Sequence, residues 1–261
     1  WLLILTVALA AVGIVVVFSI GPALAVEKGV DGGQYVVRQL LALTLGIVVF
    51  FVASFIPMRR WRQLHRPLLM LAALATLLAL LLPVNAEYPA HRWIRLGGFS
   101  FQTVELLKFA GILWLASFLS WRMTQGTIAN LHKTVKPLFA VFIATGFVVA
   151  GLQSDLGSFG VMVAIMAVLA FAAGLPMKRI LALGGIILVI LALAISTTPY
   201  RRDRLTAFLN PESSCLTAGG YQACQALIAV GSGGMIGLGL GKSVQAYGYL
   251  PEAANDSIFA I

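Results

Sequence analysis

The residues best suited to chemistry lie in the last part of the chain, from Thr198 to Ile261, which is its only long stretch rich in polar residues and glycine. Within it, Asp256 follows Pro251 and stands just before the apolar run 258–261. A carboxylate at the mouth of an apolar segment is partly desolvated, which suits it to accept a proton as a general base. An isolated aspartate is by itself only a weak catalytic signal.

Two ionisable residues fall just inside a long apolar run. Glu105 and Lys108 are three positions apart, so on a helix they share a face and can form an ion pair. Ionisable groups within apolar segments are costly and therefore default to functional candidates. Two interpretations remain open: a structural ion pair that lowers the cost of burial, or a Lys108 that offers positive charge to an anionic substrate.

A third candidate, Asp155, occupies the very short turn 153–155 between two apolar runs. The carboxylate could cap the following helix, because first-turn N–H groups and the helix dipole favour a negative charge. It could equally line a substrate site. The sequence leaves both interpretations open.

Arginines gather around the same polar regions. Arg92 and Arg95 flank Trp93, whose indole alone is typical of a membrane-interface anchor, and Arg201 and Arg204 belong to a second cluster. Guanidinium groups bind phosphates through paired N–H donors. We expect these arginines to hold a phosphate or pyrophosphate at a lipid headgroup.

Composition places these residues in a membrane protein. The chain has 261 residues, of which 60% are hydrophobic and only 10% charged, whereas a soluble domain has about 25% charged residues. Apolar runs of about 17–25 residues, long enough to cross about 30 Å of hydrocarbon, recur along it. A soluble helical core would need polar faces at helical spacing, and 68–82 shows none. The sequence therefore predicts an all-α, polytopic helical membrane protein.

We expect about seven transmembrane helices in a single integral membrane domain. Residues 1–197 form the predicted bundle, and 198–261 form a large loop with short or re-entrant helices. The glycine-rich part, 226–241, is the candidate re-entrant segment, since irregular backbone is tolerated at membrane depth only where protein buries it. The predicted spans are 1–19, 40–56, 67–84, 103–121, 137–152, 156–173 and 180–196.

The charges predict an orientation. Linkers 58–66, 122–136 and 176–179 carry Lys and Arg without any acid, while the acids fall in the alternate linkers or just inside the spans. By the positive-inside rule, the basic linkers and the N-terminus are cytoplasmic, and 198–261 is extracytoplasmic. The net charge of +9 is thus an orientation signal. With no aromatic-basic platform, it does not indicate nucleic-acid binding.

Glycines and cysteines in the loop leave further alternatives. Six glycines in 231–241 could cradle phosphate through backbone N–H groups or simply permit close packing. Cys215 and Cys224, both in the predicted outer loop, could form a disulfide or remain free thiols. No grouping of His, Cys and carboxylates has the spacing of a metal site.

Several motifs, taken in order, resemble the SEDS family of peptidoglycan glycosyltransferases of the FtsW and RodA type, with wording closer to the cell-division branch. They span nearly the whole chain. The motifs are Arg92-Trp93-Ile94 with Gln102 and Glu105-Leu106-Leu107-Lys108, Gln153-Ser154-Asp155-Leu156-Gly157, Tyr200-Arg201-Arg202-Asp203-Arg204-Leu205, Phe208-Leu209-Asn210-Pro211, Gly220-Tyr221-Gln222, the glycine run, and Tyr249-Leu250-Pro251-Glu252-Ala253 with Asp256.

The resemblance implies that the protein joins lipid II units into glycan strands in the bacterial cytoplasmic membrane. Asp256 takes the position of the essential loop carboxylate and would deprotonate the acceptor's 4-hydroxyl as undecaprenyl pyrophosphate leaves. It also implies a class B penicillin-binding transpeptidase as partner, and leaves a divalent cation, Mg²⁺ or Mn²⁺, as an open alternative. The residues we expect to contact or tune the substrate are Arg92, Trp93, Arg95, Glu105, Lys108, Asp155, Arg201, Arg204, Gln222 and Glu252.

The sequence departs from the family at a few positions. Thr103-Val104 replace Pro-Ser, Ser154 replaces Pro, and Ala254-Asn255 replace His-Thr beside Asp256. Family members continue through about three further spans, and this chain opens on Trp1 without Met, so we expect a longer natural protein.

Two other functions remain: a transporter (flippase) of a lipid-linked precursor, and a non-catalytic scaffold for a transpeptidase. A transporter would place charge along a path through both leaflets. The ionisable groups instead cluster on the predicted outer side, which favours the enzyme.

Overall fold

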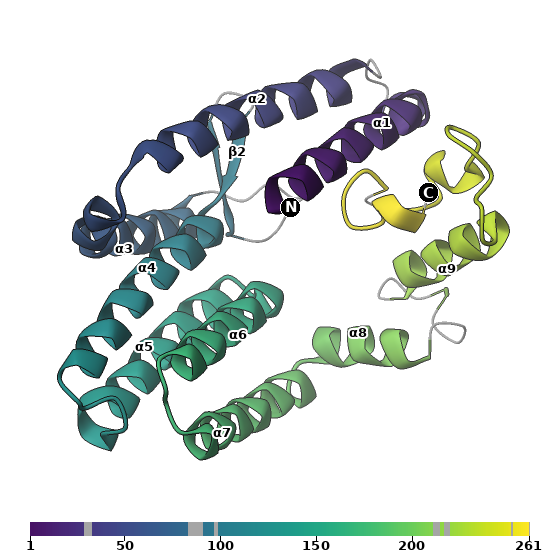
Figure 1. The fold of residues 1–261 in the computed structure, drawn as a ribbon. Helices are drawn as coiled ribbons and strands as arrows, with labels where there is room; N and C mark the ends of the chain where they lie inside the picture. The colour runs from purple at the N-terminus through teal and green to yellow at the C-terminus, as the bar shows by residue number, and fades with distance from the viewer. Residues whose placement is uncertain are drawn as a thin grey trace. The chain divides into compact units, whose positions relative to one another are not determined.

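The computed structural model describes residues 1–28, 33–82, 91–96, 99–210, 215–216, 220–251 and 253–260. This part of the chain is built almost entirely of helices, as Figure 1 shows. The all-α prediction is confirmed. The main helices are α1 (Leu2–Lys28), α2 (Gly33–Phe55), α3 (Met58–Leu81), α4 (Thr103–Thr124), α5 (Lys136–Gly146), α6 (Leu156–Ala172), α7 (Met177–Ser196), α8 (Pro199–Leu209) and α9 (Tyr221–Gly233).

Helix α5 is extended at both ends by wider turns, η1 (Leu131–Val135) and η2 (Phe147–Leu152), so that one helical segment runs over Leu131–Leu152. Within the described residues, six helices are long and apolar enough to cross a membrane. The remaining predicted span, 156–173, corresponds to α6, which has 17 residues, or about 26 Å at 1.5 Å per residue. The prediction of about seven spans is therefore met by six full-length helices and one shorter apolar helix.

Three predicted span boundaries were clearly wrong. Helix α2 starts at Gly33, well before the predicted start at Leu40. Helix α3 starts at Met58, so the arginine-rich segment 59–66 forms its first turns and Pro67, the predicted start, lies inside the helix. Helix α1 likewise runs past the predicted end at Ser19 to Lys28. Polar residues near the end of an apolar run do not stop these helices, and neither do Pro22 in α1 and Pro67 in α3, which both lie inside their helices.

Large apolar side chains are exposed along these helices, and α2 has no buried residue at all. Exposed apolar surface on this scale marks a surface that contacts lipid. Since backbone groups in hydrocarbon must pair within the chain, helices are the expected solution. The chain is thus a multi-pass membrane protein.

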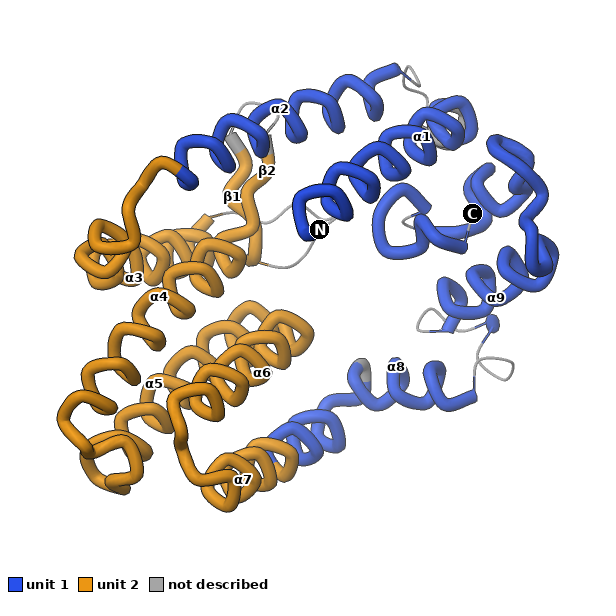
Figure 2. Tube along the Cα trace, in the orientation of Figure 1, with its two compact units in different colours: residues 1–54, 190–261 blue, residues 55–189 orange. Residues whose placement is uncertain are grey.

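The described residues divide into two compact units, coloured separately in Figure 2. Unit 1 comprises 1–54 and 190–261, and unit 2 comprises 55–189. The predicted division into a bundle, 1–197, and a loop, 198–261, stays a prediction.

In unit 2, α3 packs along α4 through a row of small buried residues. Ala72, Thr76 and Ala79 recur at helical spacing and are each at most 1% exposed. Small side chains let two helix backbones approach closely within a membrane. Helices α5 and α6 of this unit also pack together, and the ring centroids of Phe142 on α5 and Phe159 on α6 lie 4.7 Å apart.

A short antiparallel hairpin precedes α4 and was not predicted. Strand β1 (Trp93–Leu96) pairs with β2 (Phe99–Gln102), with Trp93 opposite Gln102 and Leu96 opposite Phe99. In the sequence, two glycines separate the strands, a dipeptide typical of two-residue hairpin turns. This Gly-Gly dipeptide is the sequence feature from which the hairpin could have been predicted.

Unit 1 has its own small core, in which Ile20 and Ala23 of α1 pack with Ala246 and Ala253 of the loop. Short helices are present as predicted, including the single turns η4 (Val244–Ala246) and η5 (Ile258–Ala260). The described loop glycines 234, 237, 239, 241 and 248 have positive φ angles. Glycine suits such positions because it lacks a Cβ.

Gly146 generates a stability prediction. A Cβ added there would lie 2.8 Å from two ring atoms of the buried Phe159, whereas one added at Gly160 on α6 meets nothing within 4 Å. Gly146→Ala should therefore lower the free energy of unfolding by about 1–3 kcal/mol. Gly160→Ala, the matched control, should raise it by about 0.5–1 kcal/mol. Thermal unfolding of the purified variants in detergent measures both; equal stabilisation by the two would contradict the described packing.

Candidate functional site

In unit 2, the turn between η2 and α6 is held by Arg92, which precedes β1. Its Nε donates to the carbonyl oxygen of Gln153 at 2.9 Å, and its Nη2 donates to that of Ser154 at 2.6 Å. In return, Nε2 of Gln153 donates to the carbonyl oxygen of His91 at 3.0 Å. Two of the five N–H donors of Arg92 thus serve the protein itself. Sequence reasoning expected Arg92 to bind substrate and missed this structural role.

Asp155 caps α6, as one of its two interpretations predicted. Its Oδ1 accepts from the backbone N–H of Ser158 at 3.0 Å, while Oδ2 accepts from Nε2 of Gln102 at 3.2 Å. The side chain of Asp155 is only 7% exposed. Gln102, which directly precedes α4, was quoted as part of a motif but not predicted as a site residue. The capping role is confirmed, and a role toward substrate stays a prediction.

Two buried polar atoms at this junction have no hydrogen-bond partner in the described structure: Oγ1 of Thr103 and Oε1 of Gln153. Both side chains are at most 1% exposed. Both residues are hydrogen-bonded to the segment before β1. The N–H of Thr103 donates to the carbonyl oxygen of Arg92, and Nε2 of Gln153 donates to that of His91. Buried polar atoms normally have a partner. These two could therefore be satisfied by a bridging water or a ligand hydroxyl.

Glu105 and Lys108 form the ion pair that their spacing predicts, with Nζ 2.6 Å from Oε1. The Lys108 side chain is 18% exposed and that of Glu105 is 55% exposed. The pair is therefore partly solvated, and its net contribution to stability is small. Contact with an anionic substrate stays a prediction for both residues.

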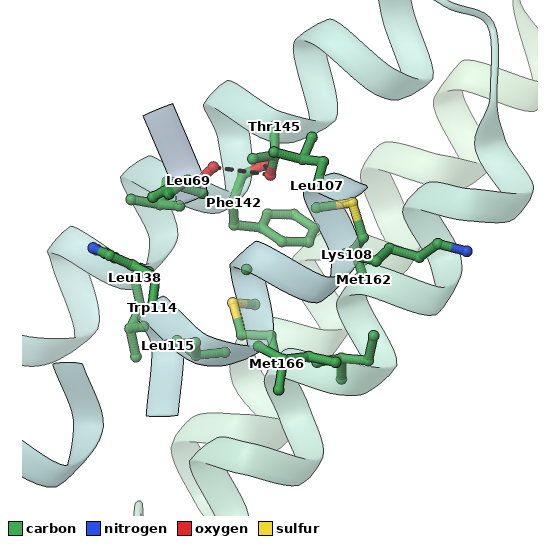
Figure 3. A pocket seen from close by; sticks show the side chains of 14 residues that line it. Leu69, Leu107, Lys108, Trp114, Leu115, Leu138, Phe142, Thr145, Met162 and Met166 are labelled. Atoms are coloured by element: carbon green, nitrogen blue, oxygen red, sulfur yellow. Dashed lines mark hydrogen bonds between the residues drawn. The ribbon is translucent and has the colours of Figure 1, made fainter. Parts of the chain in front are cut away.

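Beside Lys108 lies an apolar pocket of about 60 Å³, between α3, α4, α5 and α6. Figure 3 shows the Phe142 ring within it, while the Lys108 chain extends outward with its ammonium group away from that ring. The lysine stem lines the pocket and the charge lies outside, as is common for long basic side chains. The pocket suits hydrocarbon rather than sugar or phosphate.

The hairpin presents two of the predicted residues. Trp93 and Arg95 alternate with Ile94 in β1, so they project from the same face of the strand. Trp93 is 40% exposed and Arg95 is also exposed. An exposed indole next to a guanidinium group fits the predicted interface anchor and anion contact, and both roles stay predictions.

In unit 1, Asp256 is exposed and stands between two buried residues, Ala253 at 2% and Ser257 at 8% exposure. The partial desolvation predicted for this carboxylate is therefore not found in the described structure. The adjoining turn η5 does not bury the carboxylate, and its own Phe259 is 88% exposed. The loop therefore presents the exposed carboxylate of Asp256 between the buried residues Ala253 and Ser257.

The other predicted residues of unit 1 are distributed over α8 and α9. Nη1 of Arg201 donates to the carbonyl oxygen of Ala194 at 3.3 Å, which caps the end of α7. Arg204 lies exposed on the same helix, α8. Gln222, in the first turn of α9, bonds to the loop that carries Asp256. Glu252 lies outside the described residues.

Cys215 and Cys224 form a disulfide, which settles the alternative that the sequence left open. A divalent cation stays an open alternative. In the part of the chain that the structure describes, no group of three or more His, Cys, Asp or Glu side chains is placed to hold a metal ion.

The sequence matches the family model described as "Cell cycle protein", covering FtsW, RodA and SpoVE, over residues 1–261. The chain belongs to this family. It is 37% identical to the probable peptidoglycan glycosyltransferase FtsW of Coxiella burnetii over 100% of the chain and 69% of that protein. It is 34% identical to the stage V sporulation protein E of Bacillus subtilis, over 100% of the chain and 70% of that protein.

Solved structures agree with this FtsW-type membership. A structure of a peptidoglycan synthase complex, described as coordinating polymerization and crosslinking, matches with a TM-score of 0.65 and 30% identity. The match covers 90% of this chain and 65% of that one. The rod shape determining protein RodA of Thermus thermophilus, at 24% identity and a TM-score of 0.50, shares the fold. The FtsW-type chain thus spans about two thirds of several relatives.

Ser154 generates a prediction, because it is the one described non-glycine residue with a positive φ, at 53°. Proline, which the family resemblance implies at this position, is fixed near −65° and cannot adopt that conformation. Ser154→Pro should therefore disrupt the turn that Arg92 holds and lower the melting temperature of the purified protein. Ser154→Gly, which tolerates positive φ, should stay within about 1 kcal/mol of the natural chain. A proline variant as stable as the glycine variant would show that the turn is shaped differently.

Proposed function

We propose that this family member is a peptidoglycan glycosyltransferase that polymerises lipid II into glycan strands, with Asp256 as the general base. The observation that carries the proposal is the Asp256 loop: an exposed carboxylate held between buried residues, in a chain that matches the family over its whole length. Curated relatives that are 35–37% identical bear the name probable peptidoglycan glycosyltransferase FtsW.

The proposed reaction needs a single base. The Asp256 carboxylate accepts the proton of the acceptor sugar's 4-hydroxyl while that oxygen attacks the donor's anomeric carbon. A carbon–oxygen bond forms there as the bond to pyrophosphate breaks, and undecaprenyl pyrophosphate leaves with the electron pair. The α-linked donor becomes a β-1,4-linked residue. One displacement with inversion requires no enzyme nucleophile.

Each unit, taken by itself, carries basic groups that we assign to pyrophosphate binding. Arg204 is exposed on α8, in the same unit as Asp256, and Arg201 on that helix is half-buried. In unit 2, the ammonium group of Lys108 lies outside its apolar pocket. We assign Arg92 chiefly to the turn 153–155, because two of its donors are engaged there.

We further propose the orientation and the partner. With the basic linkers in the cytoplasm, the N-terminus is cytoplasmic and 198–261 faces the outside of a bacterial cytoplasmic membrane, where the glycan strand grows. A class B penicillin-binding transpeptidase is the proposed partner. The structural relative is a complex that combines polymerization with crosslinking, which supports a partner of this kind.

The test is polymerisation of labelled lipid II by the purified full-length protein with its transpeptidase partner. Asp256→Asn keeps the shape but removes the base, so the rate should fall by about 10²- to 10⁴-fold. Asp203→Asn is the matched control, since Asp203 is another exposed aspartate of unit 1, on α8. It should polymerise at close to the natural rate. Full activity of Asp256→Asn would overturn the assignment.

A further inference from the structure

We infer that Gln222 is a positioning residue, which fixes the Asp256 loop to helix α9, rather than a ligand of the substrate. The inference rests on the proposed function of Asp256. Nε2 of Gln222 lies 3.4 Å from the carbonyl oxygen of Pro251 and 3.3 Å from Oγ of Ser257. These two acceptors stand on either side of Asp256 in the sequence. A single amide group therefore closes the loop.

The bond to Ser257 is an internal one. Ser257 is 8% exposed and Gln222 is half-buried, so the bond between them is partly buried, while the bond to Pro251 lies at the surface. The amide nitrogen of a glutamine carries two N–H donors, and the loop supplies two acceptors. The donors are thereby used within the protein. Asp256, directly before the buried Ser257, is exposed.

Both ends of this clamp are themselves held. On one side, Ala253 is 2% exposed and packs with Ile20 and Ala23 of α1. On the other, Gln222 lies in the first turn of α9, where Cys224 is tied by the disulfide to Cys215. The loop is thus fixed to α1 by apolar packing and to α9 by hydrogen bonds. If the hydrogen bonds of Gln222 are lost, the apolar packing of Ala253 against α1 still holds the loop at one side.

Within the loop, a few backbone bonds report on its order. The N–H of Leu250 donates to the carbonyl oxygen of Gln245 at 3.0 Å, and that of Ala260 donates to Ser257 at 2.9 Å. Such bonds protect amides from exchange only while the loop stays closed. Amide exchange of 250–260 therefore measures the clamp directly, without reference to activity.

The experiment compares hydrogen–deuterium exchange of peptides covering 250–260 in the full-length protein and its variants. Gln222→Ala, and the isosteric Gln222→Glu that lacks the N–H donors, should speed exchange about tenfold, the factor that 1.4 kcal/mol represents. Gln225→Ala, the same change one turn further along α9, should leave exchange unaltered. Ser257→Ala should give a smaller increase, and none beyond that of Gln222→Ala when the two are combined.

Kinetics with lipid II supply the second readout. A displaced Asp256 lowers kcat by about tenfold, with KM within about twofold, because the clamp acts on the base and not on binding. Unchanged exchange with a raised KM would overturn the inference and return Gln222 to the substrate ligands. If exchange rises but Asp256→Asn retains activity, the clamp stands and the proposed function fails.

Discussion

Inside hydrocarbon, backbone N–H and C=O groups find no water, so each must pair within the chain. This constraint explains the long helices, and it also limits where irregular backbone can occur. In the described part of the chain, unit 2 has irregular backbone before the hairpin and at the turn 153–155, and unit 1 has it in the segment after α9. Each of these segments accepts side-chain hydrogen bonds on carbonyl oxygens: His91 before the hairpin from Gln153, the turn from Arg92, and Pro251 from Gln222.

In each unit, side-chain hydrogen bonds hold a loop that carries an aspartate. In unit 2, the guanidinium group of Arg92 holds the turn, which places Asp155 in a buried position where it caps α6. In unit 1, the amide of Gln222 holds the loop, which leaves Asp256 exposed. Two aspartates thus differ in environment because of how their loops are fixed. The buried Asp155 stabilises the N-terminal end of α6, and Asp256 is exposed, as the proposed base must be to contact a substrate.

Features set by local chemistry were predictable from the sequence. The spans followed from apolar runs, the Glu105–Lys108 pair from a three-residue spacing, and the cap from an aspartate directly before a helix. The clamps were not predictable, because their partners are distant: Arg92 lies 61 and 62 positions from its acceptors, and Gln222 lies 29 and 35 from its own. Composition does not specify such pairings. The exposure of Asp256 was missed for the same reason, since it depends on how the chain packs around it.

The central claim is that the chain forms glycosidic bonds rather than moving its lipid substrate across the membrane. The most direct measurement follows fluorescent lipid II in sealed proteoliposomes that contain the full-length protein and its transpeptidase partner, with the transpeptidase blocked by a β-lactam. The account predicts uncrosslinked glycan strands, with undecaprenyl pyrophosphate released in step with bond formation. Transfer of intact lipid II between leaflets, without any polymer, would contradict it and favour the transporter.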